Sequence, residues 1–110
     1  MPLYESTFIV RQDMSESEVD KVTEDFSAIV KNKGGKVVKK EYWGLRNLAY
    51  KINKSRKGHY VFLGIEASPE AVKEIERKSK LSEDVVRNLT VKVEKIEKGP
   101  SAILSADNDD

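Results

Sequence analysis

The sequence has no cysteine and only one histidine, His59, among its 110 residues. Disulfides and thiolate chemistry are therefore excluded, as is a zinc site built from cysteine and histidine ligands. No apolar run approaches the roughly 20 residues that a membrane-spanning helix needs. A signal peptide begins with a basic region followed by an apolar one, and the first five residues do not show this pattern. We therefore expect a cytoplasmic protein that does not contact a membrane.

The sequence also lacks the residue patterns that catalysis requires. No nucleophile is recognisable beside a base, and the acidic residues between positions 16 and 25 have the spacing of a solvated helix face. The loop Arg11-Gln12-Asp13-Met14 contains no glycine, so it does not form the nest of backbone donors that cradles a phosphate. We therefore expect no enzymatic activity, no catalytic residue, no metal, no cofactor and no small-molecule substrate.

What the sequence does contain is an uneven distribution of charge. The net charge is only +1, although 35% of the residues are charged. Residues 36–57 hold eight basic side chains and one acid, or +7, whereas the rest of the chain holds 12 basic and 18 acidic residues, or −6. A concentrated basic segment in a nearly neutral protein is typical of a chain with an anionic partner. The alternative is a solvated edge strand that its lysines protect from aggregation.

Hydrophobic periodicity predicts six elements in the order βαββαβ. Apolar residues alternate along the predicted strands and follow helical spacing in the predicted helices. The expected strands span residues 3–10, 36–52, 58–67 and 86–95, and the expected helices span residues 16–33 and 69–80. Two right-handed β-α-β crossovers in this order produce an α+β, ferredoxin-like fold. Its four-stranded antiparallel sheet has both helices on one face, so the other face is open to a partner.

Local signals mark the ends of these elements. The segment Ser15-Glu16-Ser17-Glu18 has the form of a capping box, and Gly34-Gly35 suits the end of the first helix. Ser68-Pro69 places a capping residue and a first-turn proline before the second helix. Gly44 predicts a bulge or bend in the second strand, and residues 53–58 suggest a polar, basic turn. We expect one domain over residues 1–98 and a disordered acidic tail over residues 99–110.

The central segment closely resembles one family, the sixth protein of the bacterial small ribosomal subunit. The segment runs from Tyr42 to Lys54 and on through residues 57–61. The residues that match the family pattern in register are Gly44, Arg46, Leu48, Ala49, Tyr50, Ile52 and Lys54. Tyr4-Glu5 and Asp84-Val85-Val86-Arg87 resemble the family's opening and closing segments, so the resemblance covers about residues 3–95. Lys51 departs from the pattern at a common proline, and Asn47 at a frequent second arginine.

The resemblance implies a ferredoxin-like fold and a structural role in the small ribosomal subunit. It also implies binding to the central domain of 16S rRNA, alongside the eighteenth small-subunit protein as a protein partner. The arginine of the closing segment, Arg87, is then an RNA-binding candidate. The long acidic tail of some relatives is largely absent here, so modification of that tail is not carried over.

Two neighbouring groups of residues are candidate contact surfaces. A flexible cationic turn suits a phosphate backbone, which makes RNA-binding candidates of Lys51, Lys54, Arg56 and Lys57. The stretch before it mixes the anchor types of protein interfaces, which makes protein-partner candidates of Trp43, Leu45, Arg46 and Leu48. The sequence leaves other readings open, namely an ordinary solvated turn, burial of the tryptophan in its own sheet, and a surface ion pair for the arginine.

Two other functions share this architecture. A stand-alone RNA-recognition motif would need a run of aromatic and small residues on its third strand, and residues 57–62 match only the first two positions of that motif. A small-molecule regulatory domain of this fold would usually recur in a multidomain chain, whereas we expect this domain to stand alone. The ribosomal role is therefore the preferred reading.

Overall fold

The computed structural model describes residues 1–52 and 55–104, and the side chains of residues 49–55 lie outside the description. The elements follow the predicted order: β1 (Leu3–Arg11), α1 (Glu16–Asn32), β2 (Lys36–Ile52), β3 (Ser55–Glu66), α2 (Pro69–Leu81) and β4 (Val85–Val93). The sheet order is β2-β3-β1-β4, and every neighbouring pair is antiparallel. The predicted ferredoxin-like α+β fold is confirmed.

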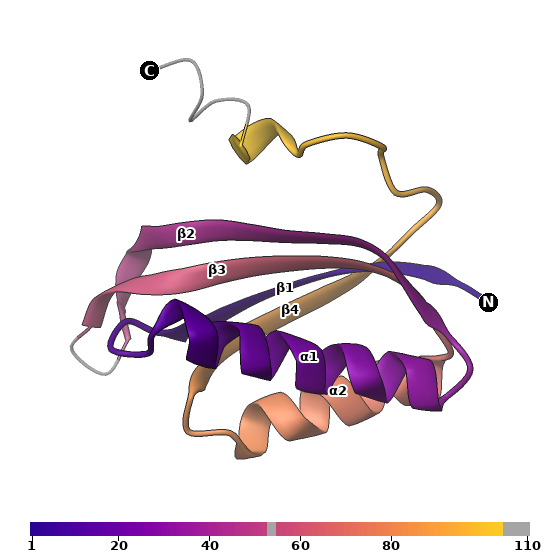
Figure 1. Ribbon diagram of the computed structural model, residues 1–110, viewed down its shortest axis with the longest axis horizontal. Helices are drawn as coiled ribbons and strands as arrows, with labels where there is room; N and C mark the ends of the chain where they lie inside the picture. The colour runs from indigo at the N-terminus through magenta and orange to yellow at the C-terminus, as the bar shows by residue number, and fades with distance from the viewer. Residues whose placement is uncertain (53–54, 105–110) are drawn as a thin grey trace.

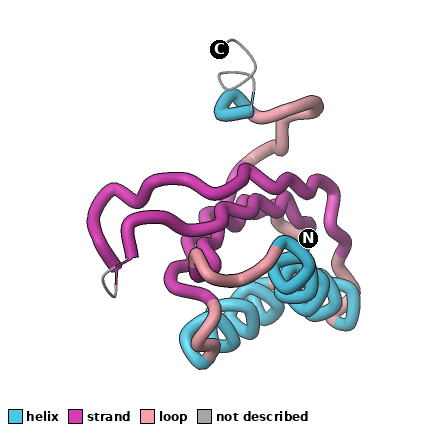
Figure 2. Tube along the Cα trace, turned by 60° about the vertical axis from the view of Figure 1, so that its left-hand side comes forward, coloured by secondary structure: helices cyan, strands magenta, loops and turns pink. Residues whose placement is uncertain are grey.

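Both helices cover the same face of the sheet, as Figures 1 and 2 show. The opposite face, called the open face below, carries no helix from α1 or α2. Beyond β4 the chain continues on this open side, near β2. One face of the sheet therefore packs against the helices, and the other is available for contacts with the C-terminal segment or with a partner.

The core lies between the sheet and the helices. In β1, the central strand beside both β3 and β4, Ser6, Phe8 and Val10 are fully buried. The ring of Phe8 meets the ring of Phe26 of α1 edge-on, with 4.9 Å between their centroids. Alternation along β1 thus turns every second side chain toward the helices, as the sequence predicts.

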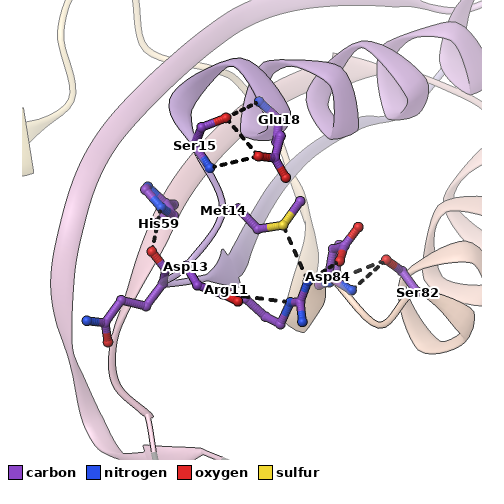
Figure 3. Close-up of polar contacts among 10 residues, drawn as sticks. Arg11, Asp13, Met14, Ser15, Glu18, His59, Ser82 and Asp84 are labelled. Carbon is purple, nitrogen blue, oxygen red and sulfur yellow. Dashed lines mark hydrogen bonds and ion pairs between the residues drawn. The ribbon is translucent and has the colours of Figure 1, made fainter.

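The predicted ends of α1 are confirmed. The Ser15 hydroxyl accepts a hydrogen bond from the Glu18 backbone N–H at 3.2 Å, and the Glu18 carboxylate accepts one from the Ser15 backbone N–H at 3.5 Å (Figure 3). The chain leaves α1 through Gly34, whose φ of 82° lies in the left-handed region that favours glycine. These local bonds explain why the sequence alone located this helix.

The loop between β1 and α1 is tied to the start of β4. Figure 3 shows Arg11 reaching from the end of β1 to Asp84, with 2.8 Å between its Nη2 and the carboxylate. The same nitrogen donates to the Met14 sulfur at 3.4 Å. Contacts with Asp84 and Met14 therefore fix the Arg11 side chain. It lies at the end of the sheet where the β2–β3 hairpin is also found.

The hairpin of β2 and β3 differs from the prediction in one respect. Residues 55–58 belong to β3 and not to a turn, because the two strands keep pairing, with Asn47 opposite Lys57 and Ile52 opposite Ser55. The predicted turn is thus wrong over those residues, while residues 53 and 54 lie outside the described part. The predicted irregularity at Gly44 is confirmed by its φ of 92° and by the register shift between Tyr42 and Gly44.

Residues 94–104 follow β4 without belonging to the sheet. The Leu104 backbone N–H donates to the Ser101 carbonyl at 3.0 Å, which closes one helical turn. Residues 105–110 lie outside the described part of the chain. The division into a domain over 1–98 and a tail over 99–110 stays a prediction.

Candidate nucleic-acid and protein interface

The cationic candidates lie toward the hairpin end of β2 and β3. Arg56 and Lys57 are near the start of β3, and both side chains are exposed. Neither forms an ion pair or a side-chain hydrogen bond with another described residue. The side chain of Lys51 and the whole of Lys54 lie outside the description. The two described cations thus present unneutralised charge at this end of the molecule.

Arg87 joins this end of the sheet from a different strand. It lies on β4 opposite Ile9 of β1, which in turn lies opposite Tyr60 of β3. Ile9 alternates with Phe8 and Val10 of the core, so Arg87 and Tyr60 are on the open face. Two strand spacings, roughly 10 Å, separate the backbones of these two residues. The exposed Arg87 therefore lies on the open face, two strands away from β3.

Trp43 lies flat on the open face. Its ring stacks on Phe62 of β3, with 5.4 Å between centroids and 15° between planes. Phe62 alternates with the core residues Val61 and Leu63, so it faces away from the helices, yet it is only 5% exposed. The Trp43 side chain is half-buried, and its indole N–H donates to a Glu41 carboxylate oxygen at 2.9 Å. Trp43 therefore combines partial burial in its own sheet with one accessible face.

The other protein-partner candidates extend from this point along β2. Leu45 is 45% exposed, whereas Arg46 and Leu48 are half-buried. The Arg46 side chain donates from Nε to the Trp43 carbonyl at 2.7 Å, which folds it back over the Gly44 bulge. Leu48 lies on the open face above Gly58, since its δ-carbon is 3.6 Å from where a β-carbon on Gly58 would be. Arg46 pairs with Gly58 and so shares the open face with Trp43 and Leu48. Leu45 pairs with His59 and so lies on the helix side of β2. The structure thus brings three of the four candidates together on one face, and the fourth lies on the other side of the same edge strand.

Comparison with known proteins identifies the family of this chain. A family model described as ribosomal protein S6 matches residues 3–92. The small ribosomal subunit protein bS6 of Paramagnetospirillum magneticum is 54% identical over 110 residues, which cover the whole of this chain and 76% of that protein. The chain belongs to the ribosomal protein S6 family.

Further relatives agree with this assignment. The bS6 protein of Rickettsia canadensis is 52% identical over 104 residues, which cover 94% of this chain and 86% of that protein. The crystal structure of 30S ribosomal protein S6 from Thermotoga maritima superposes with a TM-score of 0.77 at 27% identity. That match covers 84% of this chain and 87% of the other. The family predicted from the central segment is therefore confirmed by both sequence and fold.

Membership in the S6 family makes this chain a protein of the small ribosomal subunit, located on the cytoplasmic ribosome. The family consists of structural ribosomal proteins and not of enzymes, as the sequence predicts. Within residues 1–52 and 55–104, no helix is long and apolar enough to cross a bilayer.

The buried His59 is part of the scaffold of this S6 chain. The Gln12 carbonyl accepts a hydrogen bond from Nε2 at 3.3 Å, so Nδ1 accepts one from the Tyr42 hydroxyl at 2.7 Å. Burial, with Glu16 and Asp20 nearby, raises the pKa of the Tyr42 hydroxyl, so this donor keeps its proton. The pair joins β2, β3 and the loop before α1 on the helix side, away from the open face.

Sequence reasoning missed three residues that shape the open face. Glu41 accepts the indole N–H, Phe62 supports the ring, and the Lys39 ammonium lies 5.6 Å from the centroid of the Phe62 ring. The sequence did contain a signal, because Glu41 is the single acid among the basic residues 36–57. An isolated acid in such a segment is expected to have a specific partner, since leaving it unpaired beside a sheet would be costly.

The charge of Glu41 predicts a pH dependence of stability. Burial raises the pKa of its carboxyl group, but hydrogen bonds from Ser101 and Trp43, together with the ammonium of Lys39, outweigh burial and lower the pKa below 4.5. The contribution of Glu41 to the free energy of unfolding is therefore complete above pH 4.5 and is lost as the pH falls through the lowered value. We expect the stability difference between wild type and Glu41→Gln to shrink at acid pH.

Urea unfolding at a series of pH values, from about 7 down to about 2, measures that difference. A difference between the two proteins that stays constant across the series would contradict the assigned contacts of Glu41.

Proposed function

We propose that this S6 family member binds the central domain of 16S rRNA together with the eighteenth protein of the small subunit, through two separate surfaces. The phosphate surface comprises Lys51, Lys54, Arg56, Lys57 and Arg87. The partner surface comprises Trp43, Leu45, Arg46 and Leu48. The observation that supports this division best is that Arg56 and Lys57 are exposed and unneutralised at the hairpin, while Trp43 lies half-buried on the open face.

Each surface has the chemistry that its partner requires. Exposed cations release counterions when they meet phosphates, so they bind RNA without reading its sequence. On the open face, the half-buried indole and Leu48 offer apolar area that a protein partner covers, and Arg46 adds a planar donor. Leu45 adds exposed apolar area on the helix side of the same strand. β2 is also an edge strand, since only β3 pairs with it, so a partner chain can hydrogen-bond to its outer side.

The burial of Phe62 argues against the alternative function as an RNA-recognition motif. Such motifs stack bases on aromatic rings of an open sheet face. Phe62 is on that face, but Trp43 covers it and leaves 5% of it exposed. Contact with the RNA backbone therefore fits this sheet better than base stacking.

A salt titration tests the phosphate surface. If three or four phosphates are neutralised, the logarithm of affinity for a central-domain rRNA fragment falls with log salt at a slope of roughly −2 to −4. The double variant Arg56→Ala with Lys57→Ala is expected to flatten that slope by about one to two units. The titration is run with and without the partner protein.

The matched control removes the same amount of charge elsewhere. Lys31, in the last turn of α1, and Lys73, in the first half of α2, are both exposed. The end of α1 and the start of α2 lie away from the hairpin (Figure 1). The double variant Lys31→Ala with Lys73→Ala is expected to keep the wild-type slope. Equal flattening by both double variants would mean that net charge, and not the hairpin, determines binding.

A further inference from the structure

The segment after β4, residues 94–104, lies over the open face and is called the strap below. Figures 1 and 2 show it on the side of the sheet opposite the helices. Three contacts attach it there, one over β3 and two on β2. The ribosomal role proposed above does not account for a self-docked segment beside the partner surface.

The first contact is apolar and depends on a glycine. Gly64 lies in β3 on the open face, where Ile96 of the strap covers it. A β-carbon at Gly64 would lie 3.0 Å from two side-chain carbons of Ile96 and 3.2 Å from the Lys39 β-carbon. Real contacts are rarely that short, so the missing side chain provides the space that Ile96 fills.

The other two contacts are polar and lie next to each other on β2. The Lys39 ammonium donates to the Glu97 carbonyl at 2.9 Å. The Ser101 backbone N–H donates to Oε2 of Glu41 at 3.0 Å, and its hydroxyl also hydrogen-bonds to this carboxylate. Both sheet side chains are largely covered, with exposed fractions of 14% for Lys39 and 10% for Glu41. These charge-assisted bonds are therefore shielded from water, which strengthens them.

Glu41 connects the strap to the partner surface. Its Oε2 atom accepts from Ser101, while its Oε1 atom accepts the indole N–H of Trp43. With both oxygens engaged, the carboxylate has one orientation, and that orientation holds the Trp43 ring against Phe62. The Trp43 side chain is only half-buried, so part of its surface remains available to a partner.

We propose that the strap is a positioning device that orients Trp43 for the protein partner through Glu41. The inference rests on the proposed function, because it takes Trp43 as part of the partner surface. A side chain that is already ordered loses less entropy when a partner binds, so docking of the strap raises affinity. By thermodynamic reciprocity, the bound partner stabilises the docked strap by the same factor.

The test uses full-length variants that leave Glu41 and Trp43 unchanged. Ser101→Pro removes both the backbone N–H and the hydroxyl that reach the carboxylate. The control is Glu97→Gln, since this side chain belongs to the strap but is 74% exposed and pairs only with Lys95 among the described residues. Because proline also alters the local backbone, Ile96→Ala weakens the strap independently by removing the side chain that packs on Gly64.

The first measurement is made on the free protein, in which Trp43 is the single tryptophan. Hydrogen exchange of its indole N–H is expected to accelerate roughly 2- to 10-fold in Ser101→Pro and in Ile96→Ala, the range that corresponds to one hydrogen bond. The control Glu97→Gln is expected to match wild type. An unchanged exchange rate in both strap variants would overturn the inference, whether or not the partner binds.

The second measurement is affinity for the eighteenth small-subunit protein. We expect both strap variants to bind roughly 2- to 10-fold more weakly, the cost of ordering one large side chain. In wild type, the partner should slow exchange of the Ser101 amide by a similar factor. Tighter binding by the strap variants would show that the strap competes with the partner, and would overturn the positioning role. Failure of wild type to bind at all would instead reject the proposed function.

Discussion

Replacing Phe8 by alanine is expected to lower the free energy of unfolding by about 3–5 kcal/mol. Phe8 is fully buried in the middle of β1, with β3 on one side and β4 on the other. The paired backbone cannot collapse into the cavity that the substitution leaves. The edge-to-face contact with Phe26 is lost as well, which is worth about 0.5–1.5 kcal/mol. Urea unfolding followed by circular dichroism measures the change.

The matched control for Phe8 is on the opposite face of the same sheet. Leu89 of β4 is 60% exposed, and its neighbour in register is Thr7, which alternates with Phe8. We expect Leu89→Ala to change the free energy of unfolding by less than about 0.5 kcal/mol, as exposed substitutions usually do. A similar cost at Phe8 and Leu89 would show that the assignment of buried and open faces is wrong.

Replacing Trp43 by alanine is expected to weaken binding of the eighteenth small-subunit protein roughly 30-fold or more, or about 2 kcal/mol. The proposal makes Trp43 the largest anchor of the partner surface, and its ring is already placed against Phe62. The substitution removes the anchor and exposes the Phe62 ring. The partner surface would then leave a gap over this ring. Calorimetric titration of the partner protein measures the affinity, and the salt slope of RNA binding should stay nearly unchanged.

Two variants define what the Trp43 result means. Trp43→Phe keeps a ring on Phe62 but loses the indole N–H that Glu41 accepts, so we expect an intermediate loss of affinity. Leu81→Ala removes a 69% exposed leucine at the end of α2, in the helical layer, and should have no effect on affinity. Equal losses at Leu81 and Trp43, or a loss of the salt slope in Trp43→Ala alone, would refute the division into two surfaces.

Much of the fold was predictable because its signals are local. The capping box at Ser15, the glycine at position 34 and the Ser68-Pro69 start of α2 satisfy backbone groups within a few residues along the chain. The alternation of residues along β1 placed Phe8 on one sheet face and its neighbours Thr7 and Ile9 on the other. The central segment around Gly44 was long enough to indicate the S6 family, and both the bulge and the family are confirmed.

The candidate surfaces were only partly predictable. Exposure of Arg56 and of Lys57 agrees with the predicted cationic surface, although both are in a strand and not in a turn. Their assignment to RNA, and that of Trp43 to a protein, stay predictions. The half-burial of Trp43 shows that two readings the sequence left open, burial in its own sheet and access for a partner, are compatible.

The sequence by itself determined the order of the elements, the ends of the helices and the family, because each depends on periodicity or on bonds between near neighbours. Only the tertiary structure decided what surrounds Glu41. Its two carboxylate oxygens bind Trp43, two residues away, and Ser101, 60 residues away. That second contact depends on the path of the whole chain, from β2 through β4 and back across the open face. No local pattern specifies such a path, because it results from how the packed layers direct the chain after its last strand.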